Sequence, residues 1–210
     1  FIWQVVKDRQ GGLWLATKDA GLAYLSPDWK DFTNFTHVPD DADSLSSGRV
    51  TALLAGGDHA LWVGGPDGQL DRLDLGSGDV EHMAPLLKLT PLGVTALAEA
   101  GKGRVWVGFH NGLGVFDGHA LKRVNDPQLH GGVRWMTADS DGQAYVSPPG
   151  AGVLRVDAKT MKVTALQLAH SGEAGLETSQ LSMHDGGLWR ASHAGLSRLD
   201  AAGGQFNDVP

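Results

Sequence analysis

The sequence predicts an all-β protein, specifically a β-propeller with five four-stranded antiparallel blades in this chain. The first support is a unit of short apolar runs and Gly/Asp turns that occurs five times. The second is an aromatic residue at the same place in each unit, 39 to 48 residues from the next. These aromatic residues are Trp14, Trp62, Trp106, Tyr145 and Trp189. A period of this length, built from several short strands, is typical of propeller blades.

The first unit reads as a four-stranded antiparallel meander. A turn at 8–12 separates its first two apolar runs, and further turn residues separate the others. We expect strands at 2–6, 13–17, 21–25 and 32–35. The linker that follows, 38–48, is the most polar stretch of the chain, and its Pro and Ser residues favour an ordered surface loop over a strand.

The second and third units carry dipeptides that favour tight hairpins. The second unit runs from Val50 to about Met83 and has Asp67-Gly68 at its second turn, and the third has Asn111-Gly112 there. Both dipeptides tolerate the positive φ angles of a two-residue hairpin turn, which we therefore expect at both places. The strands expected in the third unit are 94–99, 104–109, 113–117 and 120–124.

The fourth unit is the most divergent copy, because Tyr145 replaces Trp and Pro148-Pro149 replaces a Gly-rich exit. We expect strands there at 133–138, 144–147 and 152–157, with a turn at 139–143. The fifth unit spans 179–200 and closes with 204–209. Taken as blades of one domain covering 1–210, the units occupy about 1–37, 50–84, 94–124, 133–168 and 177–210.

The repeated aromatic residues have a structural explanation. A blade buries both sheet faces against its neighbours, so the aromatic residues are expected to pack between blades. Two residues after each aromatic stands a small residue, which leaves room for the indole of an adjacent blade. These small residues are Ala16, Gly64, Gly108, Ser147 and Ala191.

Composition narrows the functional classes. The net charge of −7 disfavours nucleic acid and anionic lipid as direct partners. The chain contains no Cys, which excludes thiolate nucleophiles and Cys-ligated zinc. No composition break divides the chain, and we expect one domain. Because it opens at Phe1 in mid-pattern without an initiator Met, we expect a piece of a longer protein.

Four stretches of the chain resemble the two-component regulator propeller repeat, in which an Asp/Gly turn is followed by "LW", a small residue, and "GL" with an Asp. They read DRQGGLWLATKDAGLAYL, HALWVGGPDGQLDRLD, GRVWVGFHNGLGVFD and DGGLWRASHAGLSRLD. The linker FTHVPDDADSLSSGRVTAL is similar to the segment that joins successive repeats in that family. The resemblance covers nearly the whole chain, although the fourth unit departs from it at Tyr145 and Pro148.

This resemblance implies a function as well as a fold. Proteins of the family carry such propellers as extracytoplasmic input modules of hybrid sensor histidine kinases and diguanylate cyclases. It implies a periplasmic, non-enzymatic module of an inner-membrane protein that binds a small molecule or a protein. The expected partners are this ligand and a downstream signalling domain of the same polypeptide, with homodimerisation as one route of signalling. A kinase or cyclase domain would lie outside this chain.

Candidate ligand-binding residues follow from the strand order. The loops between second and third strands and the linkers between blades are expected on one face, where propellers usually bind ligands. Two of the candidates, His110 and His193, occupy the same place in units three and five. This invites a metal-binding or general-base role, but exposed turn histidines explain it better, because no carboxylate recurs beside them at a metal-ligand spacing. The candidates are Lys18, Arg49, Asp67, His110, Asn111, Arg134 and His193.

Other motifs are explained more simply by local structure. The stretch 139–143 begins like a calcium loop, but the twelfth position, which needs a bidentate acid, is Gly150. The acidic stretch 40–44 and the stretch 100–104 are expected as a solvated loop and a hairpin turn. Trp3 and Trp135 lie on innermost strands, where stacking on a ligand is conceivable but packing against the next blade is favoured. We predict no catalytic residue, metal or cofactor.

Three questions stay open at this stage. The blades either close into a five-blade ring or form part of a larger propeller, in which case the terminal sheet faces need partners. A propeller enzyme of the metal-dependent lyase or lactonase type is an alternative to the sensor. A scaffold that binds a protein on its outer surface is another.

Overall fold

The computed structural model describes residues 1–28, 30–57, 59–83, 93–168, 178–200 and 204–209. They form β-strands, turns and one short 3₁₀ helix at Pro127–Leu129, whose capping residue Asp126 accepts a hydrogen bond from the Gln128 amide. No helix in these ranges has the length and apolar character needed to cross a membrane. The unit boundaries expected at 84, 177 and 210 lie outside the described residues.

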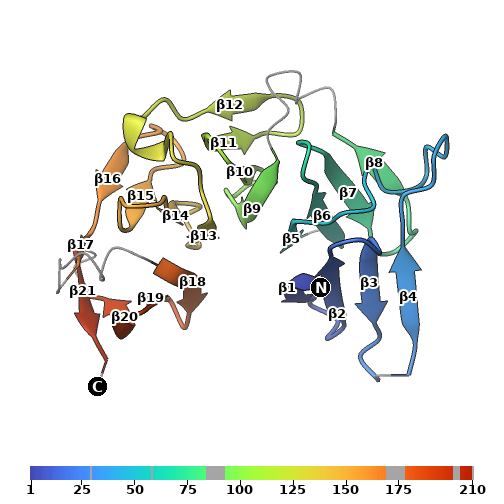
Figure 1. The fold of residues 1–210 in the computed structure, drawn as a ribbon, viewed down its shortest axis with the longest axis horizontal. Helices are drawn as coiled ribbons and strands as arrows, with labels where there is room; N and C mark the ends of the chain where they lie inside the picture. The colour runs from blue at the N-terminus through green and yellow to red at the C-terminus, as the bar shows by residue number, and fades with distance from the viewer. Residues whose placement is uncertain (29, 58, 84–92, 169–177, 201–203, 210) are drawn as a thin grey trace. The chain divides into compact units, whose positions relative to one another are not determined.

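The chain divides into two compact units, residues 1–97 with 118–121, and residues 98–117 with 122–210. The first unit contains two complete four-stranded antiparallel sheets, each in chain order (Figure 1). The strands of the first sheet are β1 (Ile2–Lys7), β2 (Leu13–Thr17), β3 (Leu22–Leu25) and β4 (Phe32–Phe35). Those of the second sheet are β5 (Ala52–Ala55), β6 (Ala60–Gly64), β7 (Leu70–Asp74) and β8 (Val80–His82).

The third sheet, in the order β12-β11-β10-β9, takes residues from both units, because the boundary falls inside β9. Its strands are β9 (Val94–Glu99), β10 (Val105–Phe109), β11 (Gly112–Phe116) and β12 (Leu121–Arg123). The fourth sheet, in the second unit, consists of β13 (Trp135–Ala138), β14 (Ala144–Ser147), β15 (Leu154–Val156) and β16 (Val163–Ala165). The sequence therefore predicted the order of these strands. The ranges expected in the first, third and fourth sheets overlap the observed strands, and those of β2, β4, β9 and β14 have the same bounds.

The last sheet differs from the prediction, because it has five strands and one parallel pair. Its strands are β17 (Gln167–Leu168), β18 (Thr178–His184), β19 (Gly187–Ser192), β20 (Gly195–Leu199) and β21 (Gln205–Asp208). β17 pairs in parallel with β21, and the Gln167 amide donates to the Gly204 carbonyl at 3.1 Å. Leu166, buried in one cluster with Phe206, holds the chain there directly after β16 ends. The expectation of four antiparallel strands was wrong for this sheet.

The hairpin turns also differ in detail from the expected ones. In the third sheet Phe109 pairs with Gly112, so the two-residue turn is His110-Asn111 and Gly112 belongs to the strand. In the second sheet Gly64 pairs with Leu70, which leaves a five-residue loop in place of a two-residue turn. That loop is closed by the Gly65 amide, which donates to the Gln69 carbonyl at 2.9 Å. The Asp67 amide also donates to the Gln69 side-chain oxygen, so Gln69 stabilises the wider loop.

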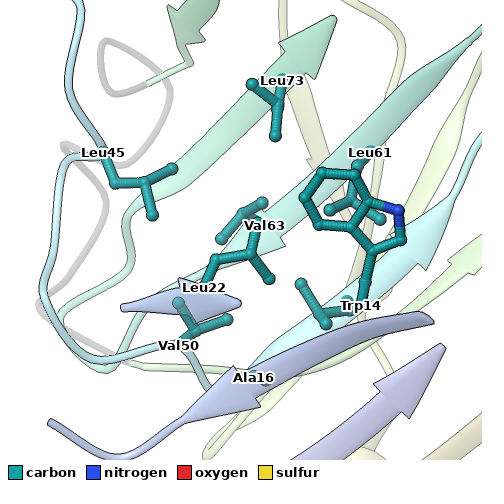
Figure 2. Packing of buried hydrophobic residues seen from close by; sticks show 9 residues of the cluster. Trp14, Ala16, Leu22, Leu45, Val50, Leu61, Val63 and Leu73 are labelled. Carbon is teal, nitrogen blue, oxygen red and sulfur yellow. The ribbon is translucent and has the colours of Figure 1, made fainter. Parts of the chain in front are cut away.

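The core of the first unit lies between its two sheets (Figure 2). Trp14, Ala16 and Leu22 of the first sheet meet apolar residues of the second sheet, and the linker contributes Leu45, with Val50 beside it. Trp14 also contacts Tyr24, with ring centroids 4.5 Å apart. The members contributed by the second sheet are Leu53, Leu61, Val63 and Leu73.

In the second unit, two aromatic residues of the repeat connect neighbouring sheets. Trp106, which is fully buried, donates from its indole Nε1 to the Gly142 carbonyl at 2.8 Å. Gly142 (φ +80°) is required there, because a Cβ would lie 2.5 Å from the Ala100 carbonyl oxygen. Tyr145 is buried in a cluster with Leu181, Leu188 and Phe206 of the last sheet.

The remaining aromatic positions are less uniform. Trp62 is buried. Two residues later, Gly64 makes room for Val94, because a Cβ at position 64 would lie 2.5 Å from Val94 Cγ1. At position 64 the space is therefore filled by a valine and not by an indole. Trp189 is only half-buried, and the Arg198 guanidinium lies 5.3 Å from its ring centroid.

Candidate functional site

Where the structure describes the end of a linker, at residues 50, 94 and 133, the chain returns to the end of the second strand of the sheet it leaves. In the first unit the Val50 amide donates to the Thr17 carbonyl at 3.1 Å, and the Val94 amide to the Gly65 carbonyl at 2.9 Å. In the second unit the Val133 amide donates to Phe109 at 2.9 Å. The loops between second and third strands therefore adjoin the linkers, the arrangement on which the candidate residues were chosen.

In the first unit the structure places Lys18 and Arg49 in adjoining segments. The Gly21 amide, in the loop after Lys18, donates to the Gly48 carbonyl at 2.9 Å, next to Arg49. Lys18 is half-buried, with its Nζ 5.9 Å from the centroid of the Phe1 ring, whereas Arg49 is exposed. Asp67 is exposed in the five-residue loop of the second sheet.

In the second unit the structure places His110 and Asn111 next to the linker that leads to Arg134. His110 and Asn111 form an exposed turn, and the linker leading to Arg134 packs on it, since a Cβ at Gly132 would lie 2.4 Å from the His110 carbonyl. Arg123 Nη2 donates to Asn111 Oδ1 at 2.8 Å, and its guanidinium lies 4.8 Å from the Phe109 ring centroid. Burial there lowers the pKa of Arg123 below its ordinary value.

His193 occupies the matching turn of the last sheet, since Ser192 pairs with Gly195 and leaves His193-Ala194 as the turn. His193 is exposed. Trp3 and Trp135 are also accessible, with 57% and 37% of their surfaces exposed. The turns expected at 139–143 and 100–104 form, each closed by a hydrogen bond between its end residues.

A polar cluster in the first unit was not predicted from the sequence. Asp71 on β7 is only 2% exposed and pairs across the sheet with His82 on β8. Ser46, in the linker, donates its amide to Asp71 Oδ2 at 2.8 Å and its hydroxyl to Asp71 Oδ1. His82 Nδ1 lies 2.8 Å from both Asp71 Oδ1 and Ser46 Oγ, and its Nε2 lies 2.9 Å from the Ala42 carbonyl oxygen.

This cluster raises the pKa of His82 above its ordinary value. The largest cause is the hydrogen bond to Asp71, and partial burial opposes it. The charge of Asp71, the Ala42 carbonyl and the charge of Asp43 also favour the protonated ring. The sequence held a signal for the Asp71–His82 pair. Asp71 interrupts an apolar strand, and the hairpin turn at 75–79 places it opposite His82.

Ser46, His82 and Asp71 are the residue types of a hydrolytic triad, but their arrangement serves another purpose. In a triad one ring nitrogen faces the hydroxyl while the other faces the carboxylate. Here Nδ1 faces both groups, and Nε2 faces a backbone carbonyl. A triad needs one ring nitrogen to accept the serine proton and the other to be oriented by the acid, and the ring of His82 is not placed in this way. The contacts of the cluster instead bind the linker to the second sheet.

A cavity of about 320 Å³ lies between the first and second sheets of the first unit. Aromatic side chains and carboxylates share its wall, which suits a neutral or cationic small molecule better than an anion. Burial, followed by the charges of Asp8 and Asp28, raises the pKa of Tyr24 in this wall. None of the seven candidate ligand-binding residues lines the cavity. Its lining consists of Asp8, Gln10, Trp14, Tyr24, Thr33, Phe35, His59, Leu73, Asp74, Leu75 and Gly78.

Within the cavity wall Asp8 fixes the turn between β1 and β2. Its Oδ1 accepts hydrogen bonds from the Gln10 and Gly12 amides, and its Oδ2 accepts one from Trp14 Nε1 at 2.9 Å. Asp139 repeats this role in the fourth sheet, where its Oδ2 accepts from the Tyr145 hydroxyl at 3.1 Å. Burial, and then Asp139, raise the pKa of Tyr145 to about 12.

Across the described ranges, no group of three or more His, Asp or Glu side chains is arranged to hold a metal ion.

Comparison with solved structures gives the same fold. The chain matches the extracellular domain of a protein described as a hybrid two-component system from B. thetaiotaomicron, with 22% identity and a TM-score of 0.78. That match covers 99% of this chain but only 28% of the other. Two lyases match over 100% of this chain and 69% of theirs: a streptogramin B lyase (17% identity, TM-score 0.76) and an inactive virginiamycin B lyase from Staphylococcus aureus crystallised with quinupristin (12%, 0.77). These neighbours are β-propeller proteins. Neither the protein-family models nor the curated proteins gave a match.

Proposed function

We propose that this chain is the ligand-sensing input domain of a bacterial two-component receptor or diguanylate cyclase, and that it is not itself an enzyme. The observation that carries the proposal is the match of 99% of the chain, at a TM-score of 0.78, to an extracellular domain of a two-component system. The repeats and linker that resemble the regulator propeller family support it independently. On this proposal the five sheets are propeller blades and the domain lies outside the cytoplasm.

Signalling on this proposal is a shift of an equilibrium. A ligand changes the output only if it binds one conformational or dimeric state more tightly than another. The proposed contacts are the adjoining loops and linkers that carry Lys18, Arg49 and Asp67 in the first unit. In the second unit they are the equivalent segments with His110, Asn111, Arg134 and His193. The ligand is a small molecule or a protein, and a downstream domain of the same polypeptide receives the signal.

A thermal-shift screen tests this proposal and finds the site. The probes are sugars, amino acids, organic acids and amines, applied to the wild type and to two variants. Arg49→Ala, His110→Ala and His193→Ala together remove exposed side chains of the loops and should leave the melting temperature near that of the wild type. Thr33→Tyr places a ring at an exposed position that lines the cavity.

We expect a probe that raises the melting temperature of the wild type and fails to do so with the triple variant. Binding lost only in Thr33→Tyr would move the site to the cavity between the first and second sheets. If no small molecule shifts the wild type, the small-ligand form of the proposal is wrong, and a protein-binding scaffold is favoured.

The rival function is a lyase-type propeller enzyme, favoured by the two lyase structures that share the fold. On the sensor proposal, purified protein should contain no stoichiometric metal by elemental analysis and should leave quinupristin unchanged by mass spectrometry. One equivalent of a divalent metal, or any quinupristin product, would support the enzyme. The two measurements are independent of the ligand screen.

A further inference from the structure

We propose that doubly protonated His82 fastens the linker 38–48 to the second sheet, and that loss of one proton releases it. The first unit would then carry a pH-operated latch, made of Ser46, Asp71 and His82, on the segment that leads to Arg49. The latch stands on its own contacts. Only its connection to sensing rests on the proposed function.

The ring of His82 is matched to two hydrogen-bond acceptors. Nδ1 lies 2.8 Å from Asp71 Oδ1, and Nε2 lies 2.9 Å from the Ala42 carbonyl oxygen. A neutral imidazole has one N–H, so either tautomer turns a lone pair toward one of these oxygens. The imidazolium has two N–H groups and satisfies both acceptors at once.

Ser46 does not remove this conflict. Its hydroxyl has one hydrogen, which it donates to Asp71 Oδ1, and its oxygen lies 2.8 Å from His82 Nδ1. Turning that hydrogen toward a deprotonated Nδ1 would take it from the carboxylate. Asp71 is buried, so losing any hydrogen-bond donor to its carboxylate costs free energy.

The charged groups around His82 favour its protonation. Asp71 reaches it from β7 and Asp43 acts on it from the linker. The neighbouring Arg72 and Glu81 pair with each other at 3.8 Å. His37 places its Nδ1 2.7 Å from the Leu45 carbonyl oxygen, a single acceptor that a neutral ring satisfies. His37 therefore serves as the matched control for His82.

The sign of the effect follows from the direction of the shift. The pKa of His82 is raised above the 6.5 of an ordinary histidine. Its stabilisation of the closed linker is therefore complete below that value and is lost as the pH rises through the pKa of the closed state. At acidic pH the linker is held, and at alkaline pH it is released.

The latch controls a segment that belongs to the core. Leu45, next to Ser46, is 1% exposed in the cluster between the two sheets (Figure 2). Further along, Gly48 accepts from the Gly21 amide and Val50 donates to Thr17, on either side of Arg49. Opening at Ala42 and Ser46 would loosen Leu45 and allow Arg49 to change its position beside the Lys18 loop.

Hydrogen exchange measures the latch directly. Exchange of the amides of 39–48, corrected for its intrinsic pH dependence, is followed between about pH 5.5 and 8.5, across the range where histidine titrates. In the wild type we expect protection to fall severalfold toward high pH, because the pKa of His82 is higher in the closed state than in the open one. In His82→Gln the protection should be low throughout and independent of pH, and His37→Gln should behave as the wild type.

A direct titration keeps the test decisive if a variant fails to fold. The pKa of His82 in the wild type is measured by NMR and compared with that of His37. A pKa for His82 at or below the ordinary value would overturn the latch, as would equal wild-type protection at both ends of the pH range. Neither result would bear on the ligand screen, so the two proposals can fail separately.

Discussion

Replacing Trp106 by alanine will lower the free energy of unfolding by about 3 to 5 kcal/mol. The indole is fully buried in the second unit and donates to the Gly142 carbonyl. Truncation therefore leaves both a cavity and a carbonyl without its donor. Because a domain of this kind has a total stability of about 5 to 15 kcal/mol, the variant should be close to unfolding. Urea denaturation followed by tryptophan fluorescence and circular dichroism measures the loss.

Trp189→Ala is the matched control, because it removes the same side chain from the same place in another repeat. Trp189 is only half-buried, so its loss should stay below about 2 kcal/mol. Equal losses in the two variants would show that burial at the individual position does not decide the role of the repeat aromatic.

Replacing Asp71 by alanine will destabilise the first unit by about 2 to 4 kcal/mol at mildly acidic pH. The Ser46 amide, the Ser46 hydroxyl and His82 all lose their common acceptor. With the carboxylate gone, the pKa of His82 should fall toward its ordinary value, because Asp71 is the main cause that raises it. Chemical denaturation at two pH values and an NMR titration measure the two effects.

The pH dependence of this loss has a defined sign. The contribution of His82 is present at low pH and declines as the pH rises, so the difference between wild type and Asp71→Ala should shrink toward alkaline pH. It should not vanish, because deprotonation of His82 only shifts the linker toward its open form, and Ser46 still binds Asp71 in the fraction that stays closed. Asp67→Ala, an exposed acid in the same unit, is the control and should change stability by less than about 0.5 kcal/mol at either pH.

The sequence predicted strands better than it predicted turns. The runs 13–17, 32–35, 94–99 and 144–147 form strands with the expected bounds, because short runs bounded by turn residues specify them locally. The turns at Asn111-Gly112 and Asp67-Gly68 were placed from dipeptide preference alone. In the structure, register moves the first by one residue, and a Gln69 side chain widens the second.

The polar cluster shows where local patterns stop being informative. The pairing of Asp71 with His82 follows from hairpin register, but the third member, Ser46, lies 25 residues from Asp71 in the linker. Its position depends on Leu45 entering the hydrophobic core beside it. The repeat pattern predicted neither Ser46 nor His82 as a partner of Asp71. Periodicity shows what is common to all units, and this cluster belongs to one linker among those the structure describes.

The stretch 163–168 belongs to two sheets, with β16 in the fourth and β17 in the last and only Leu166 between them. The described junctions between β4 and β5 and between β12 and β13 are longer, and longer loops tolerate inserted residues at low cost. Here an insertion would pull apart either Val156 from Val163 or Leu168 from Phe206. The fourth and last sheets are thereby joined through one continuous stretch of backbone. A truncation or a graft should therefore keep these two sheets together.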